Sequence, residues 1–169
     1  MLALLGPLLL GCATNSSASL DSTIPIGGDS EQRIASLVHD WFALLEEERA
    51  EPRSLDRFMA EPSFVLMLIG GRVKSLAELD AWLAHLHSTR HDLAYQIGSF
   101  DVESVAHDLH RVGFEFERRA VDGLGARHVA RREHTWLVRV VAGRAPVIVR
   151  IDEQPLLAFS GTGPQIVCY

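Results

Sequence analysis

Positive charge and cysteine are both scarce in this sequence of 169 residues. The 16 basic residues are outnumbered by 22 acidic ones, and the net charge of -6 argues against a protein that neutralises a phosphate backbone. We therefore expect no nucleic acid partner. The chain also lacks the length for two ordinary domains, and its 47% of hydrophobic residues predict one domain with a sizeable core.

Charged side chains are missing from the first 20 residues, where Leu2 to Leu10 form an apolar run. Nine residues cannot span a bilayer core, which takes about 20 residues as a helix, but they have the length of the apolar region of a signal peptide. The stretch Leu9-Leu10-Gly11-Cys12 at the end of the run resembles the lipobox of bacterial lipoproteins. The resemblance implies cleavage before Cys12, a lipid attached to its sulfur through a thioether with acyl chains such as palmitate, and anchoring to a membrane of the cell envelope.

The segment after the cysteine, Ala13 to Ser30, is rich in Ser, Thr, Gly and Asn and predicts a flexible tether. Because Ala13 rather than Asp follows Cys12, the resemblance implies sorting to the outer membrane, with the domain facing the periplasm. No Lys or Arg precedes Cys12, which departs from the lipoprotein pattern. Either the true start lies upstream, or the run is an apolar first helix of the domain. In the second case Cys12 could pair with Cys168 in an oxidising compartment.

The helices of the folded part are predicted by apolar residues at three- and four-residue steps. The first helix is expected from an N-cap at Ser30 to a point before Pro52, and a short second helix over residues 55–59. Ser75 and Glu78 form a capping box in front of a third helix.

The strands are predicted by apolar runs and by alternation of apolar and polar residues. After the helices, the alternation predicts a long antiparallel meander with turns at Asp122-Gly123 and Ala142-Gly143. Helices packed on one face of such a sheet make an α+β domain. The predicted strands cover residues 64–69, 91–97, 112–117, 136–141 and 147–151.

This order of elements, with Trp41 on the first helix, "GGRVKS" before the third and "TWLVRVVAGRAPVIVRI" near the end, resembles the nuclear transport factor 2-like superfamily and its SnoaL-like group. The resemblance implies a cone, a cystatin-like α+β roll in which a curved antiparallel sheet wraps around the long N-terminal helix and leaves an apolar cavity. That superfamily includes isomerases, dehydratases, cyclases and non-catalytic subunits, so the fold does not carry the function. The expected division is signal peptide 1–11, tether 12–29, domain 30–155 and C-terminal tail 156–169.

A period of two in the strands places several histidines and aromatic residues on the concave face. His110 falls in phase with Phe114 and Phe116, His134 in phase with Trp136, and His91 in phase with Tyr95. The candidate ligand-binding residues are His91, Trp41, Phe114, Phe116 and Trp136. The candidate catalytic residues are His110, His134, Tyr95 and Asp40, the last at the cavity mouth.

Such a wall suits a small, mostly hydrophobic ligand. A histidine in an apolar cavity could also transfer a proton while a tyrosine donates a hydrogen bond to the oxyanion that forms. The resemblance to SnoaL-like cyclases and dehydratases implies chemistry of this kind. Glu133 and Asp152 fall on the outward register, so no carboxylate is clearly expected inside. We therefore rank a lipid-anchored binding module first, an acid/base enzyme without cofactor second, and a non-catalytic subunit that forms a homodimer third.

Two further clusters have simpler interpretations. His85, His87 and His91 lie on different faces or beyond the helix end, and no Glu accompanies them, so we expect no metal site. The arginines of the hairpin "ERRAVDGLGARHVARRE" could bind anionic headgroups, but we favour a solvated hairpin whose acidic residues serve as cross-strand partners. These arginines are Arg118, Arg119, Arg127, Arg131 and Arg132.

Overall fold

The computed structural model describes residues 28–47, 51, 53–160 and 166–167. The predicted signal peptide, Cys12, nearly all of the tether and Cys168 lie outside these residues. No helix in the described part of the chain has the length and apolar character needed to cross a bilayer. Its helices are α1 (Asp29–Glu46), α2 (Leu76–Thr89) and the short 3-10 helix η1 (Asp56–Phe58).

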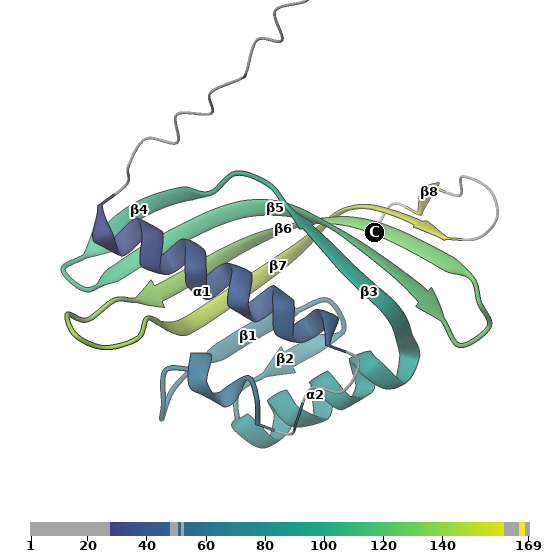
Figure 1. The fold of residues 1–169 in the computed structure, drawn as a ribbon, viewed down its shortest axis with the longest axis horizontal. Coiled ribbons are helices and arrows are strands. Elements are labelled where there is room, and N and C mark those ends of the chain that lie inside the picture. Colours follow the sequence, from purple (N-terminus) through teal and green to yellow (C-terminus); the bar gives the residue numbers. More distant parts are fainter. Residues whose placement is uncertain (1–27, 48–50, 52, 161–165, 168–169) are drawn as a thin grey trace, which may run out of the picture.

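The strands of the described residues form one mixed, curved sheet (Figure 1). Its main path runs β2-β1-β7-β6-β5-β3, with β4 paired to β5 and β8 paired to β7. β1 and β7 run parallel, and the other neighbours are antiparallel. The bounds are β1 (Val65–Leu68), β2 (Gly71–Val73), β3 (Arg90–Ile97), β4 (Asp101–Ala106), β5 (Leu109–Asp122), β6 (Arg127–Arg139), β7 (Val147–Ser160) and β8 (Ile166–Val167).

The α+β class predicted from the sequence is confirmed, with α1 lying across the concave side of the sheet (Figure 1). Strands β2 and β4 were not predicted, and β7 continues to Ser160, past the expected domain end at residue 155. The prediction of Ser30 as N-cap is wrong, because α1 begins at Asp29 and the Gly28 carbonyl accepts hydrogen bonds from the amides of Glu31 and Gln32.

The predicted cap of α2 is present in the structure. The Ser75 hydroxyl accepts a hydrogen bond from the Glu78 amide at 3.3 Å. The Glu78 carboxylate in turn accepts from the amide of Lys74, one residue before the expected Ser75. Both interactions satisfy backbone amides at the start of α2 that would otherwise have no hydrogen-bond partner.

Helix α1 holds the core through one continuous apolar face. Trp41 on this face is 1% exposed. Its indole ring meets the ring of Trp136 on β6 edge to face, with the ring centroids 5.9 Å apart. The other buried residues of α1 follow the helical period and are Ile34, Leu37, Val38, Phe42, Leu44 and Leu45. Because that face is buried along the whole helix, the sheet must curve to cover it.

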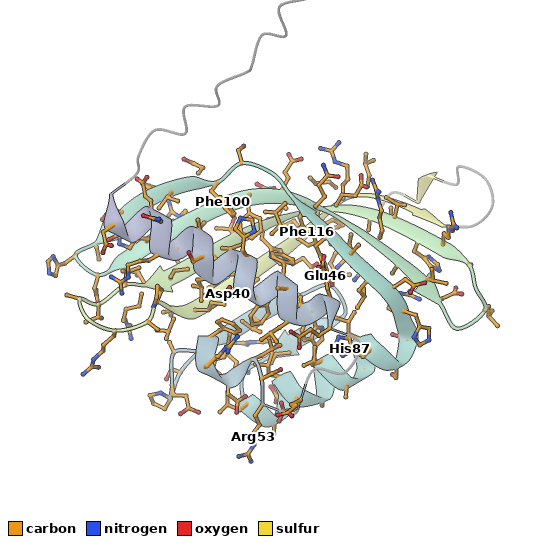
Figure 2. All side chains as sticks on the ribbon, in the orientation of Figure 1. Asp40, Glu46, Arg53, His87, Phe100 and Phe116 are labelled. Carbon is orange, nitrogen blue, oxygen red and sulfur yellow. The ribbon has the colours of Figure 1, made fainter. Side chains whose placement is uncertain are left out.

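The C-terminal end of α1 is tied to its neighbours by two polar contacts. The Glu46 carboxylate accepts a hydrogen bond from the Tyr95 amide on β3 at 2.6 Å, and His87 Nε2 on α2 lies 3.1 Å from the Leu45 carbonyl oxygen. Figure 2 shows Glu46 and His87 near this end of the helix. The contacts set the spacing between α1, α2 and β3, where the pocket described below opens.

The outer face of the sheet carries ion pairs, as expected for part of the arginine-rich hairpin. Glu115 pairs with Arg131 at 2.7 Å and Glu117 with Arg119 at 2.8 Å. Exposed pairs of this kind contribute only about 0.2 to 1 kcal/mol each. The homodimer through the sheet face stays a prediction.

Truncation of the core tryptophan tests the packing of α1. Trp41→Ala is expected to lower the free energy of unfolding by about 3–5 kcal/mol, because a buried aromatic side chain is lost and a cavity is left. The matched control is Asp40→Ala, a change at the exposed neighbouring position that should cost less than about 0.5 kcal/mol. Urea unfolding monitored by circular dichroism measures both. Equal costs for the two variants would contradict the packing.

Candidate functional site

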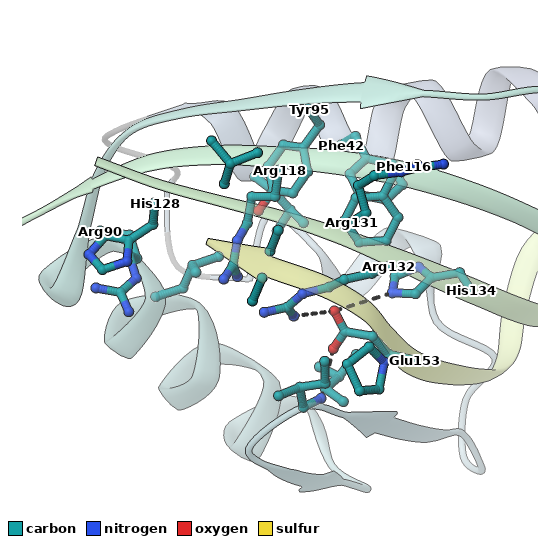
Figure 3. A pocket seen from close by; sticks show the side chains of 18 of the residues that line it. Phe42, Arg90, Tyr95, Phe116, Arg118, His128, Arg131, Arg132, His134 and Glu153 are labelled. Carbon is teal, nitrogen blue, oxygen red and sulfur yellow. Dashed lines mark hydrogen bonds and ion pairs between the residues drawn. The ribbon is translucent and has the colours of Figure 1, made fainter. Parts of the chain in front are cut away.

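A pocket of about 340 Å³ lies between the C-terminal half of α1, α2 and one end of the sheet (Figure 3). Its size falls within the range of about 300 to 1,000 Å³ that is usual for small-molecule sites. The strands β1, β3, β5, β6 and β7 each contribute side chains to it. The apolar part of its wall includes Trp41, Phe42, Leu45, Trp82, Leu86 and Phe116.

The structure brings several of the predicted site residues together. Trp41, Tyr95, Phe116 and His134 line the pocket. The prediction that His134 faces inward is confirmed, since the residue is 4% exposed and its ring lies 4.7 Å from that of Phe116, centroid to centroid. Phe114 and Trp136 are buried behind this wall, in the core, and do not line the pocket.

Three further predicted positions are not in the pocket. His91 is exposed, because β3 shifts register between His91 and Ala94, and the extra residue reverses the alternation on which the prediction rested. Asp40 is exposed on α1 (Figure 2) and does not reach the mouth. His110 is half-buried in the expected phase, but it pairs with Val138 toward the other end of β5.

A carboxylate does lie inside, contrary to the prediction. The Glu153 side chain on β7 is 6% exposed, and one of its oxygens accepts a hydrogen bond from the Ile69 amide at 2.7 Å. The other oxygen accepts from the Arg132 guanidinium and lies 3.7 Å from Nε2 of His134 (Figure 3). Glu153 is two residues after the buried Ile151, so a period of two would have found it had the predicted strand been longer.

The protons of His134 can be placed from its contacts. The indole N–H of Trp136 donates to Nδ1 at 2.9 Å, so the neutral ring carries its hydrogen on Nε2. The 3.7 Å from Nε2 to the nearer Glu153 oxygen is too long for a hydrogen bond, and Nε2 has no other partner among the described residues. Burial lowers the pKa of His134 against the opposing effect of Glu153, which keeps the ring neutral near neutral pH.

The pKa values of Glu153 and Tyr95 are shifted in opposite directions. Burial acts to raise the pKa of Glu153, but the neighbouring His134 and the Arg132 guanidinium outweigh it and bring the pKa to about 2. Burial raises the pKa of Tyr95 to about 12. At neutral pH the pocket therefore contains an ionised carboxylate and a hydroxyl group that can donate a hydrogen bond.

Two arginines of the hairpin also point inward, which corrects the view of the hairpin as wholly solvated. Arg118 follows Phe116 by two residues on β5, and Arg132 precedes His134 by two on β6. Both line the pocket, and Figure 3 shows their guanidinium groups in the same part of it. The strands are longer than predicted, so their alternation carries these two residues inside while Arg119 and Arg131 keep outer carboxylate partners.

Across the described residues, His, Cys, Asp and Glu side chains form no group of three that could hold a metal ion. The acidic and imidazole groups that do meet, Glu153 and His134, share their surroundings with the Arg132 guanidinium. A cation placed there would be repelled by Arg132. The polar groups of the pocket are better suited to orient an organic ligand.

No family model matches the sequence, and no curated protein matches it. Solved structures with a similar fold include a type 2 hexachlorocyclohexane dehydrochlorinase, with a TM-score of 0.70 and 13% identity over 82% of this chain and 93% of that one. A nuclear transport factor 2-like protein from Salmonella enterica serovar Typhimurium gives a TM-score of 0.66 and 10% identity over 74% and 89% of the two chains.

A ketosteroid isomerase-like protein from Erwinia carotovora atroseptica gives a TM-score of 0.58 and 18% identity, covering 75% of this chain and 92% of that one. At such low identities these likenesses concern the fold and not the activity. The described domain thus has the α+β fold of nuclear transport factor 2-like proteins.

Proposed function

We propose that this protein is a binding module whose pocket takes up a small, mostly hydrophobic molecule. The single observation that carries the proposal is a pocket of small-molecule size whose aromatic wall meets a few polar side chains at one end. Trp41, Phe42 and Phe116 offer apolar surface for the body of a ligand. A few polar side chains at one end can orient it, which is the usual composition of small-molecule sites.

The state of His134 and Glu153 favours binding over proton transfer. The lone pair of His134 Nδ1 is occupied by the Trp136 indole, and Nε2 is buried. Both oxygens of Glu153 accept hydrogen bonds, and a pKa of about 2 makes the carboxylate a weak base at neutral pH. General bases work best when their pKa lies near the operating pH.

An acid/base enzyme without cofactor is the second candidate. Its support is that Glu153 places a carboxylate beside His134, and that proteins of similar fold include a dehydrochlorinase and a ketosteroid isomerase-like protein. In that case a bound substrate would have to displace the Arg132 contact and so raise the basicity of Glu153. The two candidates differ in whether a molecule that co-purifies with the domain is released unchanged, which mass spectrometry can determine.

Uptake of an uncharged fluorophore tests the binding proposal. N-phenyl-1-naphthylamine should bind saturably to the full-length chain carrying Cys12→Ser, titrated without detergent. Ala158 lines the pocket, so Ala158→Trp should fill part of it and weaken binding at least about tenfold, whereas the exposed Ala84→Trp on α2 should change it less than about twofold. Absence of saturable binding, or equal affinity in the two variants, would contradict the proposal.

The pH dependence of stability tests the ionised state of Glu153. A pKa lowered from 4.5 to about 2 on folding means that ionised Glu153 stabilises the fold above about pH 5, and that this stabilisation is lost as the pH falls toward 2. Glu153→Gln should therefore lower the free energy of unfolding by on the order of 3 kcal/mol near pH 7, with a gap that narrows by about pH 3. Urea titrations across this range measure the gap.

Glu133→Gln is the control for this experiment, because Glu133 is exposed on the same strand as His134. That variant should follow the wild-type protein at every pH. A gap between wild type and Glu153→Gln that stays constant from about pH 7 to pH 3 would show that Glu153 is not the ionised group described here.

We also propose, from the sequence, that Cys12 is lipidated and tethers the domain to the periplasmic face of the bacterial outer membrane. Intact-mass analysis should find a mature chain that begins at Cys12 and carries lipid, and Cys12→Ser should release the protein from the membrane fraction. Cys168→Ser is the matched control and should leave the protein in that fraction. An unmodified chain that keeps residues 1–11 would refute this proposal.

A further inference from the structure

We infer that the ligand of this pocket is an amphipathic acid, whose anionic oxygens bind Arg118 while its apolar body lies on the aromatic wall. The inference rests on the proposed binding function and adds the chemical class of the ligand. It starts from a contrast in charge. The protein has a net charge of -6, yet the residues that line the pocket include four arginines, of which only Arg131 pairs on the outer face, and a single acidic residue, Glu153.

Two of these arginines, Arg90 and Arg118, have no counterion among the described residues. Arg90 donates a hydrogen bond to the Thr89 carbonyl, whereas Arg118 has no such partner in the described part of the chain. Arg132 is paired with Glu153, and Arg131 with Glu115 on the outer face. Among the described residues no carboxylate lies within ion-pair distance of Arg118, and none accepts a hydrogen bond from it. A partly buried charge without a partner is costly, because the protein interior solvates it less well than water.

The neighbour of Arg118 increases this cost. Arg118 faces Ala130 across β5 and β6, and Arg132 is two residues farther along β6, so the two guanidinium groups are diagonal neighbours on the inner face. Burial first, and then the charge of Arg132, lower the pKa of Arg118. An anion placed beside Arg118 would offset both effects at once.

The surroundings of Arg118 can also hold such an anion in a fixed position. Tyr95 stands directly opposite Arg118 on β3, and its hydroxyl remains protonated and able to donate. A guanidinium group can give two parallel hydrogen bonds to a carboxylate or a similar oxyacid. Carboxylates and sulfonates share the anionic oxygens that these donors require.

The apolar part of the site continues from the same place. The Tyr95 ring lies 4.9 Å from that of Phe42 and 5.8 Å from that of Phe116, centroid to centroid. A molecule whose acid group meets Arg118 can therefore lay its body on these rings. Both ends of an amphipathic acid find complementary groups within one pocket.

Two fluorophores with the same ring system separate the charge from the apolar body. Both are titrated into the full-length Cys12→Ser chain without detergent: 8-anilinonaphthalene-1-sulfonate, which carries an anionic group, and N-phenyl-1-naphthylamine, which lacks it. Arg118→Gln should weaken the sulfonate at least about tenfold, or about 1.4 kcal/mol, and leave the uncharged probe within about twofold. Arg118→Lys, which keeps the charge but not the paired donors, should fall between.

Arg119→Gln is the matched control, since Arg119 is the next residue on β5 but pairs with Glu117 on the outer face. It should change neither affinity. The inference would be overturned if Arg119→Gln also lost affinity for the sulfonate, or if Arg118→Gln kept the wild-type affinity for it. In either case, saturable binding of the uncharged probe would still support the binding function. Failure of both probes to bind wild type would refute the binding function itself.

Stability provides a check that does not depend on the probes. Removal of a charge without a counterion should leave the thermal midpoint of Arg118→Gln unchanged or raised relative to wild type. The sulfonate should raise the midpoint of wild type more than that of Arg118→Gln. A lowered midpoint in Arg118→Gln together with equal shifts by the sulfonate would show that Arg118 serves the fold, and the inference would fail.

Discussion

The carboxylate of Glu153 connects three strands at the floor of the pocket. It lies on β7, accepts a hydrogen bond from the amide of Ile69 just beyond β1, and pairs with Arg132 on β6. β1 and β7 are parallel neighbours, so Glu153 sits where the direction of the sheet changes. Because a buried carboxylate is stable only with partners of this kind, the pocket floor and the local sheet order depend on one another.

The same interaction determines what chemistry the pocket can support. An arginine that neutralises Glu153 stabilises the fold, but it also lowers the basicity of the carboxylate. His134 shows the same relation, since the Trp136 indole that orients the imidazole ring also occupies its lone pair. Because the Glu153 carboxylate and the Nδ1 lone pair of His134 are already engaged within the protein, both have little capacity left for accepting a proton.

Periodicity in the sequence predicted the parts of the fold that repeat without interruption. The apolar face of α1, the cap at Ser75 and the inward position of His134 all follow from a constant helical or strand period. His91 was misplaced because a register shift adds one residue to β3, and the sequence carries no clear mark of that shift. A single extra residue reverses the faces of the side chains on one side of the shift relative to those on the other, so His91 is exposed while Tyr95, beyond the shift, lines the pocket.

Strand length explains the other differences. Arg118 and Arg132 obey the alternation of β5 and β6, but they lie in a hairpin whose charge made it resemble a solvated turn. Burial of a charged residue is decided by the partners that tertiary structure supplies, and Glu153, which supplies the partner of Arg132, belongs to a different strand. Arg118 has no such partner in the described chain. The ligand class inferred for this pocket follows from that gap, because an anion at Arg118 would supply the charge and hydrogen bonds that the described residues do not provide.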